Sequence, residues 1–128
     1  MKVRFLSVDD VLAIHQNQLE LYGGAPGIRD QDLLESAVAM PQQMFDGKYL
    51  HSDLVEMAAA CWFHLVQNHP FHDGNKRVGL AAMLVFLFVN GRELVTDETE
   101  LEEMTMALAR SELDKPLLSD FLRPKVYP

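Results

Sequence analysis

Two almost wholly apolar segments, separated by one short polar loop, constrain the fold more than any other feature of this sequence. Residues 57–66 are apolar on nearly every side apart from His64, and residues 78–89 are apolar almost throughout. A helix that is apolar on every side is buried on every side. Both segments are shorter than the roughly 20 residues that a membrane span requires. We therefore predict an all-α fold, a compact bundle in which two central buried helices form a hairpin through the core.

Capping residues and helix breakers predict where the helices begin and end. The two central helices are expected over residues 52–68 and 75–91, with Gly91 as a good C-terminal stop. Signals of the same kind, such as the Ser7 and Asp10 capping box, place the other helices. These other helices are expected at residues 7–22, 31–40 and 96–110, with a short last helix around Pro116.

The connections between the helices are expected to be short. Residues 23–27 read Gly-Gly-Ala-Pro-Gly and predict a tight turn. Residues 41–51 show no helical period, so they are expected to form a loop or a small hairpin with Asp46-Gly47 at its turn. Residues 92–96 are expected to be a connector, and the tail from residue 123 is expected to be extended.

Length, charge and cysteine content limit the class of protein. A chain of 128 residues is expected to form a single domain over residues 1–128. The net charge of -8 repels nucleic acid and anionic lipid, so we expect neither nucleic-acid nor membrane partners. Cys61 is the only cysteine, which excludes an internal disulfide and a cysteine-based zinc site. We expect a cytoplasmic protein in which Cys61 is a small buried apolar residue.

The polar loop between the two apolar segments suggests an anion site. Gly74-Asn75 begins the second helix, whose first N–H groups have no partner within the helix and carry partial positive charge. Lys76 and Arg77 lie in this first turn, where their charge opposes the helix dipole. That arrangement becomes favourable when a phosphate chain is bound there. The sequence therefore predicts phosphate binding by residues 74–77.

Two further residues of the loop suggest the chemistry. Asp73 would repel phosphate unless a divalent cation lies between them, and Mg²⁺ bound by one carboxylate plus phosphate oxygens meets that need. His69 beside a bound phosphate could accept the proton of an incoming hydroxyl. We therefore predict Asp73 as a metal ligand and His69 as the catalytic base.

Each of these residues also has a purely structural interpretation. His69 alone could be a hydrogen-bonded core histidine, Asp73 and Asn75 alone could be helix caps, and the two cations alone could be solvated surface charges. This interpretation leaves the cations at the unfavourable helix end, so we favour the functional one. We expect Phe71 to anchor the loop in the core. The remaining histidines are expected to have structural or solvent-facing roles: His15, His51, His64 and His72.

The loop at residues 69–77, His-Pro-Phe-His-Asp-Gly-Asn-Lys-Arg, resembles the Fic/Doc family, and in particular its death-on-curing toxin branch. The blocks at residues 22–30, 33–37, 41–43, 68–71 and 86–91 agree with this branch. The resemblance implies the Fic-fold helical bundle, with His69 as general base and Asp73 as Mg²⁺ ligand. It also implies phosphate binding through Asn75, Lys76 and Arg77, with Gly74 giving the backbone room, and a target-binding flap at residues 41–51.

Two positions depart from the pattern of most AMP-transferring members. Lys76 stands where they have Gly, and Leu80 stands where they have a second Arg. The resemblance to the toxin branch implies transfer of the terminal phosphate of ATP to a Ser/Thr hydroxyl, with elongation factor Tu as the target and translation as the process blocked.

The resemblance also implies a separate antitoxin, because the sequence has no (Ser/Thr)-x-x-x-Glu-(Gly/Asn) motif of self-restrained members. Two alternatives to a protein kinase remain at this point. The first is an adenylyltransferase that moves AMP to a hydroxyl. The second is a catalytically silent binding module.

Overall fold

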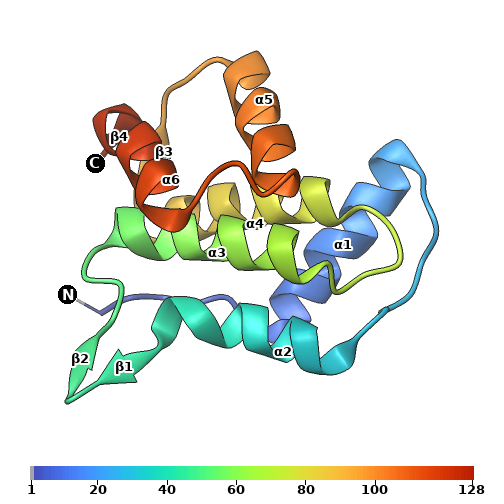
Figure 1. Ribbon diagram of the computed structural model, residues 1–128, viewed down its shortest axis with the longest axis horizontal. Coiled ribbons are helices and arrows are strands. Elements are labelled where there is room, and N and C mark those ends of the chain that lie inside the picture. The colour runs from blue at the N-terminus through green and yellow to red at the C-terminus, as the bar shows by residue number, and fades with distance from the viewer. Residues whose placement is uncertain (1) are drawn as a thin grey trace.

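The computed structural model describes residues 2–128, which form six α-helices, two 3₁₀ turns and four two-residue strands. In Figure 1, α3 lies at the centre, with α2 packed on one side and α5 and α6 on the other. The all-α expectation is confirmed. The elements are α1 (Val8–Tyr22), α2 (Gln31–Ala39), η1 (Met40–Gln42), β1 (Met44–Phe45), β2 (Lys48–Tyr49), α3 (Leu54–Asn68), α4 (Asn75–Val89), β3 (Glu93–Leu94), α5 (Glu98–Ala109), α6 (Lys115–Leu122), η2 (Arg123–Lys125) and β4 (Val126–Tyr127).

The central hairpin of α3 and α4 forms the core, as the two apolar segments predict. Ten of the side chains of α3 are buried, among them Trp62, which is 0% exposed. The Trp62 indole N–H donates to Thr105 Oγ1 at 3.0 Å and so ties α3 to α5. α4 approaches α3 closely at Gly79, where an added Cβ would lie 2.5 Å from Val66 Cγ2. The closely packed hairpin therefore fixes the end of α3 and the start of α4, and with them the loop that joins the two helices.

The short connections differ in part from the expectation. Residues 44–49 form the expected hairpin, with Asp46 and Gly47 at positive φ in its turn. Residues 93–94 of the connector, however, pair with residues 126–127 of the tail as β3 and β4, in the register Glu93↔Tyr127. The first part of the tail is not extended as expected, since residues 123–125 form the 3₁₀ turn η2. Local sequence patterns could not show this pairing because each strand has only two residues and their partners lie far apart in the chain.

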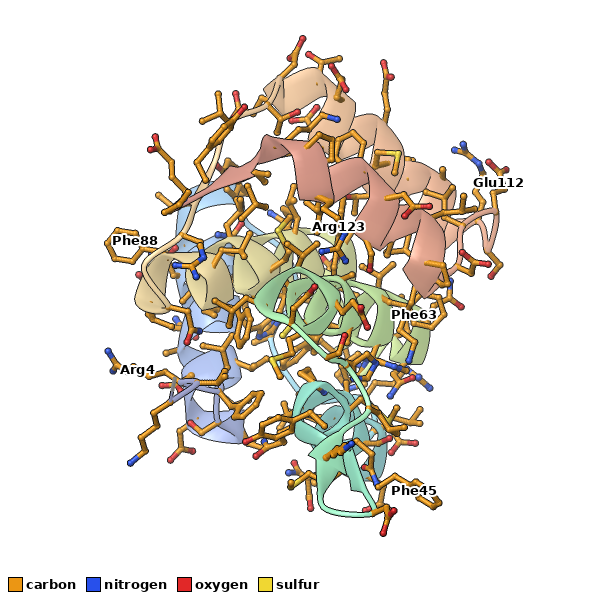
Figure 2. All side chains as sticks on the ribbon, turned by 90° about the vertical axis from the view of Figure 1, so that its left-hand side faces the viewer. Arg4, Phe45, Phe63, Phe88, Glu112 and Arg123 are labelled. Atoms are coloured by element: carbon orange, nitrogen blue, oxygen red, sulfur yellow. The ribbon has the colours of Figure 1, made fainter. Side chains whose placement is uncertain are left out.

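Two aromatic side chains project from the bundle into solvent. Figure 2 shows Phe45 at the tip of the β1–β2 hairpin and Phe88 near the end of α4, both pointing away from the ribbon. Phe45 is 75% exposed and Phe88 is 79% exposed. Among residues 2–128, no helix is both long and apolar enough to span a bilayer.

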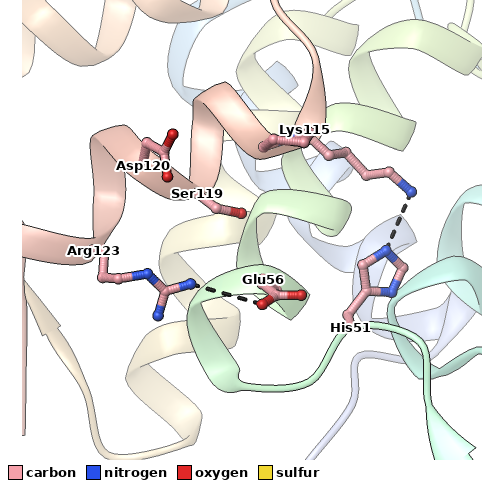
Figure 3. A pocket seen from close by; sticks show the side chains of 7 residues that line it. His51, Glu56, Lys115, Ser119, Asp120 and Arg123 are labelled. Carbon is pink, nitrogen blue, oxygen red and sulfur yellow. Dashed lines mark hydrogen bonds and ion pairs between the residues drawn. The ribbon is translucent and has the colours of Figure 1, made fainter.

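A polar cluster joins the start of α6 to α3 and to the segment before it. Lys115 Nζ lies 3.2 Å from His51 Nε2 and 3.1 Å from His64 Nε2, so its ammonium donates to both rings. A hollow of about 350 Å³ lies beside it, and Figure 3 shows Lys115 reaching across to His51 while Arg123 reaches Glu56. The two histidines thus anchor the N-terminal end of α6.

Burial also sets the ionisation of two groups in the bundle. Burial, with the Lys115 charge nearby, lowers the pKa of His64 to about 4. Burial raises the pKa of the Cys61 thiol to about 12. Cys61 is therefore an inert core thiol, as the sequence predicts.

Candidate functional site

The 69–74 loop lies at one end of the α3–α4 hairpin (Figure 1) and lines a hollow of about 200 Å³. The structure brings together seven residues of the loop and the first turn of α4, including all six for which the sequence predicts a catalytic, metal-binding or phosphate-binding role. The lining residues are His69, His72, Asp73, Gly74, Asn75, Lys76 and Arg77. Phe71 lies beneath the hollow and is 0% exposed. Its backbone pairs with Ile28 in an antiparallel bridge.

The start of α4 faces this hollow. Gly74 precedes the helix at φ 82°, a left-handed conformation that glycine adopts without strain, and no side chain of residues 2–128 caps this helix end. The Val78 amide makes the first helical bond, to Gly74 O at 2.9 Å. The amides of the three residues before Val78 therefore point beyond the helix start. This end of α4 can accept an anion.

Asp73 is held in place by backbone amides. Its Oδ2 accepts from the Ala25 N–H at 3.0 Å and its Oδ1 accepts from the Gly74 N–H at 2.8 Å. These two bonds, helped by the charge of Arg77, lower the pKa of the Asp73 carboxyl below its ordinary value. The side chain is therefore a fixed, ionised carboxylate at the surface.

The surroundings of Asp73 limit the kind of metal that it could hold. Residues 2–128 contain no group of three or more His, Cys, Asp or Glu side chains placed to bind a metal ion. A cation at Asp73 would need most of its ligands from a phosphate and from water. Mg²⁺ uses such a ligand set, because it keeps several waters and often binds one carboxylate plus phosphate oxygens. The carboxylate present therefore fits Mg²⁺.

Arg77 is directed by the turn at residues 22–24. Its Nη2 donates to Gly23 O at 3.1 Å, and its guanidinium carbon lies 5.6 Å from the centre of the Tyr22 ring. Gly24 leaves room for both side chains, since an added Cβ there would lie 2.8 Å from Asp73 Oδ2 and 3.2 Å from Arg77 Nη2. The sequence predicts only a tight turn here, whereas the turn also positions Asp73 and Arg77.

Asn75 makes contacts that the sequence did not reveal. Its side chain is buried, and its Oδ1 accepts from the Phe71 N–H while its Nδ2 donates to Phe71 O, both at 2.9 Å. The side chain thus closes the loop on itself. Its backbone N–H, at the first position of α4, belongs to the anion-facing set, so phosphate binding by Asn75 stays a prediction that concerns its backbone.

His15, on α1, contacts the loop through the buried Phe71 and the backbone of Asp73. Its ring stacks on Phe71 with 3.9 Å between centroids, and its Nε2 lies 3.0 Å from Asp73 O. The sequence predicts a structural role for His15 but does not indicate its partners. The sequence does indicate that His15 faces the core. It lies four residues after Val11, and this spacing puts both residues on the inner face of α1.

Arg29 also contacts this region, which the sequence does not predict. It lies in the turn before α2, and its guanidinium donates to Asn68 O and His69 O at the end of α3. The only sequence signal was its place in the Gly-Ile-Arg-Asp block at residues 27–30.

The sequence of this chain is similar to those of known proteins. The model of the Fic/DOC family matches residues 5–87. The chain is 31% identical over 121 residues to "Protein kinase doc" of Escherichia phage P1, covering 94% of each chain. It is 42% identical over 76 residues to "Toxin Doc" of Mycolicibacterium smegmatis, which is 59% of this chain and 58% of that protein. On these matches, this chain belongs to the Fic/Doc toxin family.

Proposed function

We propose that this protein is the toxin of a toxin–antitoxin pair and transfers the terminal phosphate of ATP to a Ser/Thr hydroxyl of a protein, with Mg²⁺ as cofactor. The observation that carries the proposal is the shared hollow. It places an ionised carboxylate, an open helix start, two cations and an imidazole around one space of about 200 Å³. A phosphate chain next to a proton acceptor is the chemistry that such a set serves.

The roles proposed for the residues follow from their positions. The amides at the start of α4, with Arg77 and Lys76, would hold the phosphates, and Asp73 would hold Mg²⁺, which screens their negative charge. His69 would accept the proton of the attacking hydroxyl. The hydroxyl oxygen would form a bond to the terminal phosphorus, and ADP would leave. Elongation factor Tu is the proposed target, and the proposed effect is a block of translation in the cytoplasm.

Two residues favour a kinase over an AMP transferase. Lys76 is exposed beside the hollow and fills the space that a glycine would leave as a bare backbone site for phosphate. Leu80, one turn further along α4, packs against the core and contributes no charge. The name of the phage relative, "Protein kinase doc", is in line with this choice.

AMP transfer remains the second candidate, because the rest of the loop follows the pattern of AMP-transferring members. ATP labelled separately on its α- and γ-phosphates distinguishes the two reactions on purified elongation factor Tu. Label from the γ-phosphate on the target is the expected result. Label from the α-phosphate would replace the kinase proposal with adenylylation.

Variants of two residues test the mechanism. We expect His69→Ala to lower transfer by about 10²- to 10⁴-fold, because a general base contributes that much. Asp73→Asn keeps an oxygen that can accept an amide hydrogen bond but removes the charge, so it is expected to abolish Mg²⁺-dependent transfer. Circular dichroism and thermal unfolding serve as controls for folding. Parental turnover in both variants would exclude the mechanism, and His69→Ala as growth-inhibitory as the parent would favour a silent binding module.

The partner surfaces are proposed on the same basis. The β1–β2 hairpin exposes Met44, Phe45 and Tyr49 and pairs with no other strand of residues 2–128, so it is suited to receive a target segment as an added strand. The proposed antitoxin is a separate chain. Co-expression of a cognate antitoxin should restore growth, and the hairpin variant Phe45→Ser should weaken target phosphorylation more than it weakens ATP hydrolysis.

A further inference from the structure

The end of α3 has a conformation that needs support from elsewhere. His69 ends the helix in the left-handed region, at φ 51° and ψ 54°. A residue with a Cβ pays about 1–2 kcal/mol in this conformation, which is why glycine usually occupies it. The last turn of α3 contains no basic residue that could complement the negative end of the helix dipole.

Arg29, from a distant part of the chain, supplies both the support for the left-handed residue and the positive charge at the helix end. Its Nε donates to His69 O at 2.7 Å, and its Nη2 donates to Asn68 O at 2.9 Å. The guanidinium therefore forms two charge-assisted bonds to the last carbonyls of the helix. The contact also places a positive charge at the negative end of the dipole.

The backbone around Arg29 reinforces this contact. The Arg29 and Asp30 amides both donate to Pro70 O, at 2.7 and 3.1 Å, and the His72 amide donates to Gly27 O at 3.1 Å. Residues 27–30 thus run along the outer side of the 69–72 segment. Three successive carbonyls, at residues 68, 69 and 70, accept hydrogen bonds from this one segment.

We propose that Arg29 is a positioning residue for His69, which fixes the left-handed turn and thereby directs the imidazole into the hollow. This inference rests on the proposed function, in which His69 is the base. Arg29 does not line the hollow, whereas the groups proposed to bind phosphate lie on α4 and in the 69–74 loop. Loss of Arg29 should therefore impair proton transfer rather than nucleotide binding.

Kinetics of two variants test the proposal. For Arg29→Ala we expect a fall in kcat of about 10- to 100-fold, by analogy with the loss of outer-shell groups that orient metal-binding side chains. The KM for ATP should change by less than about threefold. Added guanidinium at millimolar concentration should restore part of kcat. Arg29→Lys keeps the charge but cannot donate to both carbonyls in the fixed fork geometry, so its kcat should fall between those of Arg29→Ala and the parent.

A spectroscopic measurement gives a readout apart from activity. The backbone ¹³C chemical shifts of His69 report its φ, and in Arg29→Ala they should move away from left-handed values while those of the α4 core stay in place. Arg4→Ala is the matched control, because Arg4 is exposed and bonds to Asn90 through its backbone alone. It should keep parental kinetics and His69 shifts.

The possible outcomes are distinct. A parental kcat in Arg29→Ala, or a rise in KM alone, would overturn the positioning role. If Arg29→Ala does not fold, Arg29→Lys decides the question, and a parental kcat in that variant would overturn the role. If His69→Ala retains full transfer, it is the proposed mechanism that fails, and the ¹³C shifts of His69 still show whether Arg29 fixes the turn.

Discussion

The side chains of Asn75 and His15 hold the 69–74 loop in place through their contacts with Phe71. Asn75 bonds to both backbone groups of Phe71, and the ring of His15 lies flat against the ring of Phe71. Phe71 is fully buried, so its amide and carbonyl have no water to replace a lost partner. The loop therefore depends on a few buried side chains. The sequence motif suggests ligand binding for one of them, Asn75, and no specific role for the other, His15.

Asn75→Ala should destabilise the protein by about 2–3 kcal/mol, because it leaves a buried N–H and a buried C=O of Phe71 unpaired. The free energy of unfolding in urea, followed by circular dichroism, measures this loss. Asn17→Ala is a matched control, since Asn17 is exposed on α1, and it should change stability by less than about 0.5 kcal/mol. Equal midpoints for the two variants would contradict the role of Asn75 as a clamp.

Lys76→Gly should shift the reaction toward AMP transfer, because it removes a side chain and a charge from the space where other members have a bare backbone. The ratio of α- to γ-phosphate label on the target measures the shift. An unchanged ratio would mean that Lys76 does not select the phosphorus. Thermal unfolding should show a loss of about 1 kcal/mol from glycine in the helix.

The residues of the site were predictable from sequence to different degrees. His69, Asp73 and the cations stand out because they interrupt two apolar segments and lie at a helix start. Arg29 and His15 do not stand out, because their contacts cross 39 or more positions of the chain. The contact of the Asn75 side chain with the Phe71 backbone could not be predicted either, since a polar residue at a helix start also fits a helix cap or a ligand-binding residue.

At the scale of elements, the crossing of α3 and α4 sets where the loop lies. Gly79 gives α4 the clearance that it needs, because a Cβ there would meet Val66 Cγ2 at 2.5 Å and Trp62 O at 3.3 Å. The two helices could be predicted from their continuous apolar runs. The β3–β4 pairing could not, because strands of two residues leave no period in a sequence.

Gly79→Ala should destabilise the protein by about 1–3 kcal/mol, since the overlap with Val66 outweighs the better helix propensity of alanine. Chemical denaturation gives the value. The double variant Gly79→Ala/Val66→Ala should be less destabilised than the sum of the two single variants, because the smaller side chain removes the overlap. Strict additivity would show that the methyl group does not meet Val66.

The His51–Lys115–His64 cluster predicts a loss of stability in acid. The folded-state pKa of His64 is about 4, below the ordinary 6.5, so the unfolded chain takes up this proton at a higher pH. The contribution of neutral His64 to the free energy of unfolding is fully present above about pH 6.5 and is lost as pH falls toward 4. Because the ring is partly exposed, we expect about 1–2 kcal/mol after solvent screening is considered.

His64→Gln isolates this contribution, because glutamine can still accept from Lys115 and does not titrate. Urea unfolding of both proteins from pH 7 to 4 gives the difference. The parent should lose more stability than the variant over this range. Parallel curves would show that His64 is not held neutral by the fold, since the acidic residues titrate in both proteins.

At the scale of the whole molecule, the chain carries a net charge of -8 and gathers Lys76 and Arg77 at one small hollow. Such a distribution disfavours long polyanions over the surface as a whole while a short phosphate chain can still bind locally. The bundle keeps this site at the end of the α3–α4 hairpin. The β1–β2 hairpin and the β3–β4 sheet lie at the periphery of the bundle (Figure 1).

Trp62 gives the molecule a built-in optical probe. It is the single tryptophan, it is fully buried, and its indole is hydrogen-bonded to Thr105. It precedes His69 by about 10 Å along the helix axis and does not line the hollow. Its fluorescence should therefore shift to longer wavelength when the bundle unfolds and stay constant when nucleotide binds, so that one emission spectrum separates damage to the fold from occupancy of the site.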